Sequence, residues 1–195
     1  PRRHSLGGDC YVLIHNAPLS VWRAYKRGSY ERLDLRKESH RAILRGHPIR
    51  LGSYGDPVAV PLAFWQRYFE ACSPSYHTGY SHSWQLDHAQ PYRKFLMASA
   101  DSPSEAFAAQ ALGWRTFRVR DGEGDALDTW VEIVCPASAE AGYRKTCAEC
   151  GACDGAASGA QRRSIAIVAH GQRSQNRQRR GLALPAIGTP RTFAA

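Results

Sequence analysis

Six cysteines are the residues in this sequence whose type and spacing most clearly suit a chemical role. Cys147, Cys150 and Cys153 form a C-x-x-C-x-x-C run, and Cys135, which is followed by a proline, stands twelve residues before the run. Short spacers of this kind let successive thiolates face one metal centre. We therefore expect residues 135–155 to form a metal-binding loop in which these four cysteines are the ligands.

Two kinds of centre fit four thiolates. A structural zinc site usually takes its ligands from two separated C-x-x-C pairs. Three cysteines in one run, with a Cys-Pro elsewhere, resemble instead the ferredoxin pattern that holds a [4Fe–4S] cluster, although here the Cys-Pro precedes the run. We favour the iron–sulfur cluster and keep zinc as the alternative.

Disulfides are the competing use for an even number of cysteines, and they belong to oxidising compartments. The chain has 195 residues, of which 43% are hydrophobic, so it can bury an ordinary core without cross-links. It has no apolar run near the roughly 18 residues of a membrane span, and its first residues lack the apolar stretch of a signal peptide. We therefore expect a cytoplasmic protein with reduced thiols and no membrane contact.

Short apolar runs alternate with helix-like stretches, and these elements must position the cysteines. Strands are expected at 11–15, 49–53, 77–81, 95–99, 114–119, 130–134 and 165–169, and helices at 34–44, 61–71 and 102–113. Ser102 is the expected N-cap of the last helix, with Glu105 completing a capping box, and Trp65 and Trp84 are expected in the core.

This alternation predicts βαβ units and therefore an α/β fold with a parallel sheet. We favour a partial (β/α) barrel and keep an open parallel sheet as the alternative. Either architecture would make residues 1–171 one domain that includes the metal loop. Nothing after the first expected strand resembles a Gly-rich dinucleotide loop.

Polar residues follow several of the expected strands, and in parallel folds the carboxyl ends of strands gather functional groups. Asp56, His82, Asp101 and His170 each follow a different strand, so we expect them on one rim as candidate catalytic residues, with the cysteine loop beside them. Plainer interpretations remain open: Asp56 suits a turn, Asp101 suits the start of a helix, and His82 suits an exposed loop.

Positive charge is distributed unevenly along the chain. The net charge is +9, yet residues 1–154 carry 19 Lys and Arg against 17 Asp and Glu, whereas residues 155–195 carry seven Arg and no acid. Arg118 and Arg120 alternate with Val119, as on the polar face of a strand. The segment 172–195 is predicted to be a flexible basic tail whose candidate nucleic-acid contacts are Arg173, Arg177, Arg179 and Arg180.

The cysteine motifs resemble those of a family of uncharacterised proteins carried by phages, plasmids and other mobile elements. That family has Cys-x-x-Cys-Pro and then Gly-x-Cys-Tyr near its start, and residues 8–11 match the second of these. Near its end it has Cys-Pro, a C-x-x-C-x-x-C run and an apolar strand closing in His-Gly, as at residues 135–136, 147–153 and 165–171. The resemblance implies further cysteines upstream of Pro1, Cys10 as an additional candidate ligand, and the cytoplasm of a host cell.

Two functions are compatible with these observations. The first is an iron–sulfur enzyme or redox protein on a (β/α) scaffold, whose reaction the sequence does not name. The second is a nucleic-acid-binding protein in which zinc holds the cysteine loop and the basic tail contacts phosphates. Metal identity distinguishes the two.

Overall fold

The computed structural model describes residues 17–122, 124–156 and 162–169, and it confirms the predicted α/β class. An open, all-parallel six-stranded sheet lies at its centre, with the strand order β1-β2-β3-β4-β6-β5. The strands are β1 (Ile49–Leu51), β2 (His77–Ser81), β3 (Met97–Ala100), β4 (Thr116–Arg120), β5 (Glu132–Val134) and β6 (Ser164–Val168).

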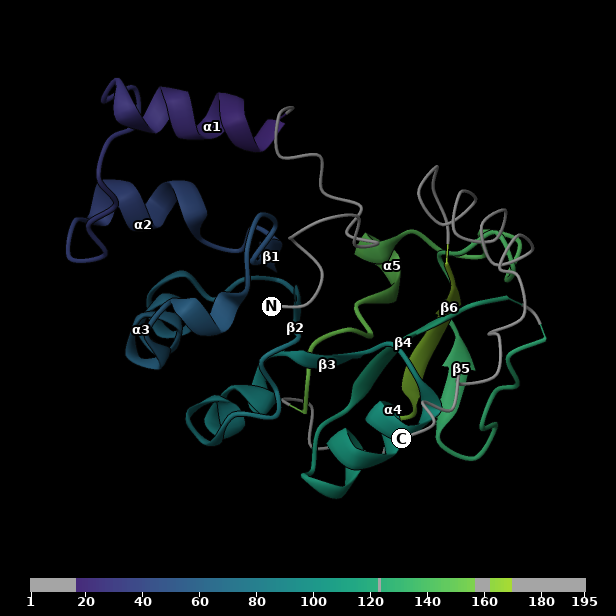
Figure 1. The fold of residues 1–195 in the computed structure, drawn as a ribbon. Coiled ribbons are helices and arrows are strands. Elements are labelled where there is room, and N and C mark those ends of the chain that lie inside the picture. The colour runs from purple at the N-terminus through teal and green to yellow at the C-terminus, as the bar shows by residue number, and fades with distance from the viewer. Residues whose placement is uncertain (1–16, 123, 157–161, 170–195) are drawn as a thin grey trace, which may run out of the picture.

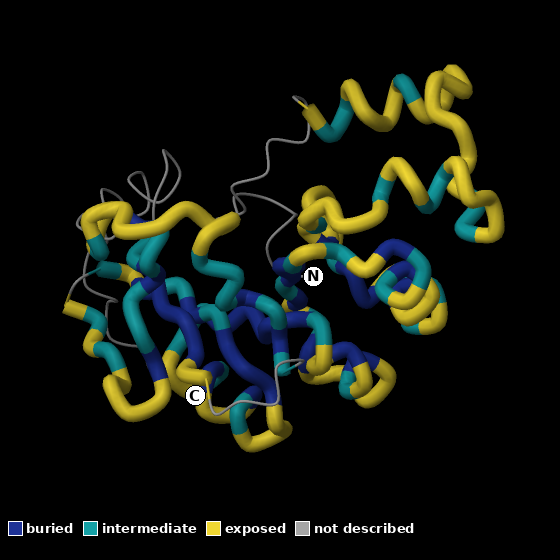
Figure 2. The backbone as a smooth tube through the Cα atoms, turned by 180° about the vertical axis from the view of Figure 1, so that it is seen from behind, coloured by how far each residue is buried: buried dark blue, intermediate teal, exposed yellow. Residues whose placement is uncertain are grey.

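Helices precede the sheet and connect its strands (Figure 1). They are α1 (Ala17–Lys26), α2 (Glu38–Leu44), α3 (Leu62–Cys72), α4 (Pro103–Ala111) and α5 (Cys147–Cys150), with 3₁₀ helices η1 (Pro57–Ala59) and η2 (Asp87–Lys94). Helices α1 and α2 stand side by side beyond the β1 edge (Figures 1 and 2). Among the described residues, no helix has the length and apolar character needed to cross a membrane.

The path of the chain explains why the sheet stays open. From β1 to β4 each new strand is added next to the previous one, in the same direction across the sheet. Strand β5 then lies one position beyond, at the edge, and β6 fills the position between β4 and β5 and pairs with both. The return leaves β1 and β5 as the two edges of the sheet. The partial barrel that we favoured is therefore not formed, and the open-sheet alternative is confirmed.

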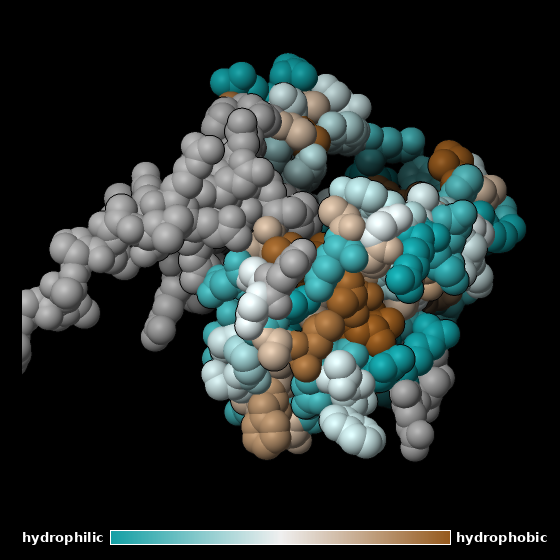
Figure 3. All heavy atoms as spheres, turned by 90° about the vertical axis from the view of Figure 1, so that its right-hand side faces the viewer, coloured by the Kyte–Doolittle hydropathy of each residue, from teal (hydrophilic) through white to brown (hydrophobic). Residues whose placement is uncertain are grey.

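Each face of the sheet has its own hydrophobic core. The first core contains Trp65, Trp84 and Trp114 packed around Leu51 and Ala98, so the two tryptophans expected in the core are buried. The second contains Met97, Cys135, Cys153, Ile165 and Ile167. Successive residues of a strand point to opposite faces, as Met97 and Ala98 do here. On the side of β5, hydrophobic residues reach the surface among polar ones (Figure 3).

The crossover from β5 to β6 lies on the second face. Right-handed crossovers that move in opposite directions across a sheet cover opposite faces. The step from β5 back to β6 reverses the direction of the steps from β1 to β4. This reversal places the cysteine run over the second core and away from α3 and α4.

The capping of α4 agrees with the sequence except in one hydrogen bond. Ser102 Oγ accepts a hydrogen bond from the Glu105 backbone at 3.1 Å, as expected of the N-cap. Glu105 Oε2 accepts from the Asp101 backbone at 2.7 Å, one residue before the position that a capping box would use. Glu105 therefore ties the end of β3 to the start of α4.

Arg118 is buried, which corrects its interpretation as a solvent-facing residue of a polar strand face. Only 1% of it is exposed, and it donates to both carboxylate oxygens of Glu132 at 2.8 Å and to Asp125 at 2.7 Å. Arg120 is also buried and donates to Glu140 at 2.6 Å. These ion pairs fasten the 121–140 segment to β4.

Candidate functional site

The crossover from β5 to β6 carries three of the four clustered cysteines, and the end of β5 supplies the fourth. Cys135 directly follows β5, and its backbone N–H donates to Ala166 of β6 at 2.8 Å. Helix α5 starts at a capping box, because Thr146 Oγ1 accepts from Glu149 N and Glu149 Oε2 accepts from Thr146 N. This capping box fixes the start of the C-x-x-C-x-x-C run.

Arg115, which lies just before β4, anchors the far end of the run. Its side chain is 10% exposed and makes an ion pair with Asp154 at 2.8 Å. The same guanidinium donates to three carbonyls of the crossover, those of Ala152, Gly155 and Arg163, at 2.7 to 3.0 Å. One buried cation therefore holds both the end of the cysteine run and the residue that precedes β6.

Backbone contacts place Cys153 against the sheet. Its carbonyl accepts from Gly79 N of β2 at 3.3 Å, and Ala156 N donates to the Arg93 carbonyl at 2.8 Å. Gly155 has a φ of +69°, and a Cβ there would lie 2.6 Å from Leu96 N. Only glycine fits this close approach without displacing backbone.

The four thiols share one electrostatic neighbourhood. Burial raises the pKa of Cys153 to about 12, with smaller contributions in the same direction from Cys135 and Cys150, while a hydrogen bond to Tyr80 acts in the opposite direction. Burial also raises the pKa of Cys135, and Cys147 and Cys150 add to the rise. Cys135 and the C-x-x-C-x-x-C run, 12 to 18 positions apart in the sequence, are thus near enough to influence one another's pKa.

The thiols do not form a ligand set as they stand. In the described part of the chain, no three His, Cys, Asp or Glu side chains are close enough to hold a metal ion. The four cysteines are free, with Cys135 and Cys153 buried, Cys150 half-buried and Cys147 exposed. The donor set matches the thiolate preference of zinc and iron–sulfur centres, but the thiols must turn toward one another to bind one.

Three of the four rim residues expected from the sequence meet beyond the carboxyl ends of β1, β2 and β3. Asp56 Oδ1 accepts from Val58 N at 3.0 Å, which caps η1, and its Oδ2 accepts from the hydroxyls of Ser81 and Ser83, both at 2.9 Å. The Nε2 atom of His82 lies 3.7 Å from Asp101 Oδ2. Asp56 therefore holds two loops together, as its turn interpretation implied, while His82 and Asp101 form an accessible imidazole–carboxylate pair.

The rim residues and the cysteines lie on opposite faces of the sheet. The hydroxyl of Ser81 donates to Asp56, whereas the neighbouring Tyr80 packs against the core that contains Cys153. Adjacent residues of a strand point to opposite faces, so Asp56 and Cys153 lie on opposite sides of the sheet and do not share the single rim that we expected, although Cys135 follows β5 at the carboxyl end of the sheet. The cause is the reversed step from β5 to β6, which carries the cysteines over the second face.

Several predicted site residues lie outside the described residues. They are His170, Cys10, and the four tail arginines Arg173, Arg177, Arg179 and Arg180.

Sequence reasoning missed Arg115 and Tyr80, which contact the cysteine run from β4 and β2. Neither belongs to a recognisable motif. The Thr146–Glu149 pair could have predicted the start of α5, because its spacing is that of a capping box.

No family model, curated protein or solved structure matches this chain in the comparisons with known proteins. The functional argument therefore rests on the residues described above.

Proposed function

We propose that this protein binds a metal centre through Cys135, Cys147, Cys150 and Cys153, and that the centre secures the crossover from β5 to β6. One observation carries the proposal: the end of β5 and the crossover bring four cysteines near enough for their thiols to influence one another's pKa, and none of them is in a disulfide. A metal ion stabilises thiolates that burial alone would keep protonated.

The way in which the thiols are held supports the same proposal. Cys135 and Cys153 are buried and fixed by backbone hydrogen bonds to β6 and β2. Cys147 and Cys150 lie on a single turn of helix with more exposure. A change of χ1 rotamer redirects a cysteine Sγ while its backbone stays in place, so two fixed ligands and two adjustable ones suit a centre that forms on metal binding.

An iron–sulfur cluster is the centre that we favour, and zinc is the alternative. Hydrogen bonds to ligand sulfurs tune the potential of a cluster, and Tyr80 packs against the core that contains Cys153, where its hydroxyl could serve this purpose. His82 and Asp101 form a separate polar site on the carboxyl rim, where the imidazole lies 3.7 Å from the carboxylate. The catalytic role expected of Asp56, His82 and Asp101 stays a proposal, and Asp56 already serves a structural purpose.

Metal analysis of anaerobically purified protein tests the proposal. We expect either iron with sulfide and visible cluster absorption, or about one zinc per chain without colour. Cys150→Ser should lower the metal content per folded chain. Cys72→Ser is the matched control, because Cys72 is a buried thiol on α3 outside the cluster, and it should retain the metal. Equal metal content in both variants, or none in the unaltered protein, would refute the ligand assignment.

A further inference from the structure

Helices α1 and α2 and the segment between them form a surface that the other described residues leave largely uncovered. We call residues 17–45 the helical face. Neither α1 nor α2 contains a buried residue. Both helices appear almost wholly exposed or half-buried beyond β1, in contrast to the sheet and α3 (Figure 2). Helices without buried side chains gain little stability from packing, so this exposure calls for another explanation.

Positive charge in the described residues is concentrated on the helical face. Residues 17–45 carry eight Lys and Arg against three Asp and Glu, whereas the other described residues carry 11 against 12. The three acids are already paired: Glu31 with His40 and Lys37, Asp34 with Arg36, and Glu38 with Arg41 and Arg45. Among the described residues, no carboxylate pairs with Arg23, Lys26, Arg27 or Arg32.

Exposed aromatic rings accompany these cations. Trp22 is 55% exposed and Tyr25 is 63% exposed, and their ring centroids lie 5.7 Å apart at an interplanar angle of 31°. Lys26 Nζ lies 5.5 Å from the Trp22 ring centroid, and Tyr30 is 54% exposed in the segment after α1. Flat, accessible rings flanked by cations are the elements on which nucleic-acid bases stack.

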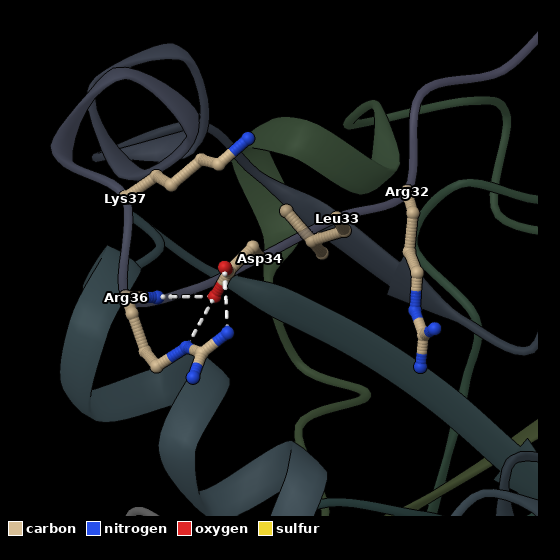
Figure 4. A pocket seen from close by; sticks show the side chains of 5 residues that line it. All are labelled: Arg32, Leu33, Asp34, Arg36 and Lys37. Atoms are coloured by element: carbon tan, nitrogen blue, oxygen red, sulfur yellow. Dashed lines mark hydrogen bonds and ion pairs between the residues drawn. The ribbon is translucent and has the colours of Figure 1, made fainter.

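A basic hollow of about 440 Å³ opens in the segment before α2. Its lining residues are Arg32, Leu33, Asp34, Arg36 and Lys37. Arg36 is turned toward Asp34 and neutralises it, while Lys37 and Arg32 flank the hollow on either side of Leu33 (Figure 4). Lys37 is paired with Glu31, so Arg32 is the lining cation that no described carboxylate neutralises and that remains to attract a phosphate group.

We propose that the helical face binds a single strand of nucleic acid, with bases stacked on Trp22 and Tyr25 and the backbone following Lys26, Arg27 and Arg32. Charge complementarity selects a polyanion, and the exposed rings select one whose bases are unpaired. A duplex keeps its bases stacked inside the helix and would use the charge alone. Residues 17–45 include none of the four clustered cysteines and none of the tail arginines, so the inference does not depend on the metal centre.

Fluorescence titration of the full chain with an oligo(dT) of about 15 nucleotides tests the proposal, since that length spans a typical single-strand site. Base stacking should quench tryptophan emission. Trp22→Ala/Tyr25→Ala should weaken binding by about tenfold or more. Trp130→Ala removes a ring that is 90% exposed elsewhere on the surface, and this control should bind like the unaltered protein.

The salt dependence of binding separates the helical face from the tail. Lys26→Ala/Arg27→Ala should lower the slope of log affinity against log salt by about 0.7 for each cation removed. Lys94→Ala, an exposed cation on η2, should leave the slope unchanged. Equal affinity of the Trp22→Ala/Tyr25→Ala and Trp130→Ala variants would overturn the proposal. So would a duplex that binds as tightly as the single strand and is insensitive to loss of the two rings.

Discussion

Replacing Arg115 by methionine should release the end of the cysteine run from the sheet. Methionine keeps much of the apolar stem but removes an ion pair to Asp154 and leaves three crossover carbonyls without their donor. Breaking a buried charge pair typically costs about 3–5 kcal/mol, and charged hydrogen bonds contribute about 1.5–3 kcal/mol each. Because some of the carbonyls can gain water, we expect a loss of about 3–5 kcal/mol in the free energy of unfolding.

Urea unfolding followed by circular dichroism in the presence of a chelator measures this loss without the contribution of a bound metal. The melting temperature of a chain of this size should fall by roughly 6–20 °C. Arg162→Ala is the control, because Arg162 also meets Asp154, at 3.3 Å, but is 48% exposed. Exposed ion pairs contribute up to about 1 kcal/mol. If Arg115→Met costs no more than Arg162→Ala, the anchoring role is wrong.

Two further predictions concern buried ionisable side chains. Arg118→Met should lower the free energy of unfolding in urea by about 3–5 kcal/mol, because it leaves the buried Glu132 carboxylate without its partner. Adding Glu132→Met should recover most of that loss. A double variant no more stable than the single one would contradict this. Burial raises the pKa of Cys153 to about 12 from an ordinary 9.0, so the unfolded chain loses the thiol proton at a lower pH than the folded chain does. The free energy of unfolding of the metal-free protein should therefore be constant below about pH 9 and fall towards pH 12. Urea unfolding measured across this pH range should show a smaller decline for Cys153→Ala. An unchanged decline would rule out Cys153 as its cause.

The fold was predictable where local signals and packing agree. The strand at 77–81 matches β2 at both ends, because its short run is bounded by turn residues. The helix predicted at 61–71 appears as Leu62–Cys72. Helix α1 was not among the predicted helices, and it buries no residue. The strand predicted at 11–15 lies outside the described residues.

The candidate site was predictable only in part, because its position depends on topology. Local spacing identified the cysteines, and the parallel order brought His82 close to Asp101, as expected. The reversed step from β5 to β6 is a long-range choice with no local signature, and it separated the two groups. The burial of Arg118 could not be predicted from the sequence either, because its partner Glu132 lies on β5, which is not adjacent to β4 in the sheet.

The inner position of β6 sets the order in which the protein can assemble during synthesis. β6 is the last strand of the described chain, yet it pairs with both β4 and β5, and β5 pairs with no other described strand. At the usual rate of translation, β4 therefore waits about 2–10 s with one edge unpaired before β6 emerges. An unpaired edge is a template for aggregation, so nascent chains that stall within the cysteine crossover should be the species that chaperones must protect.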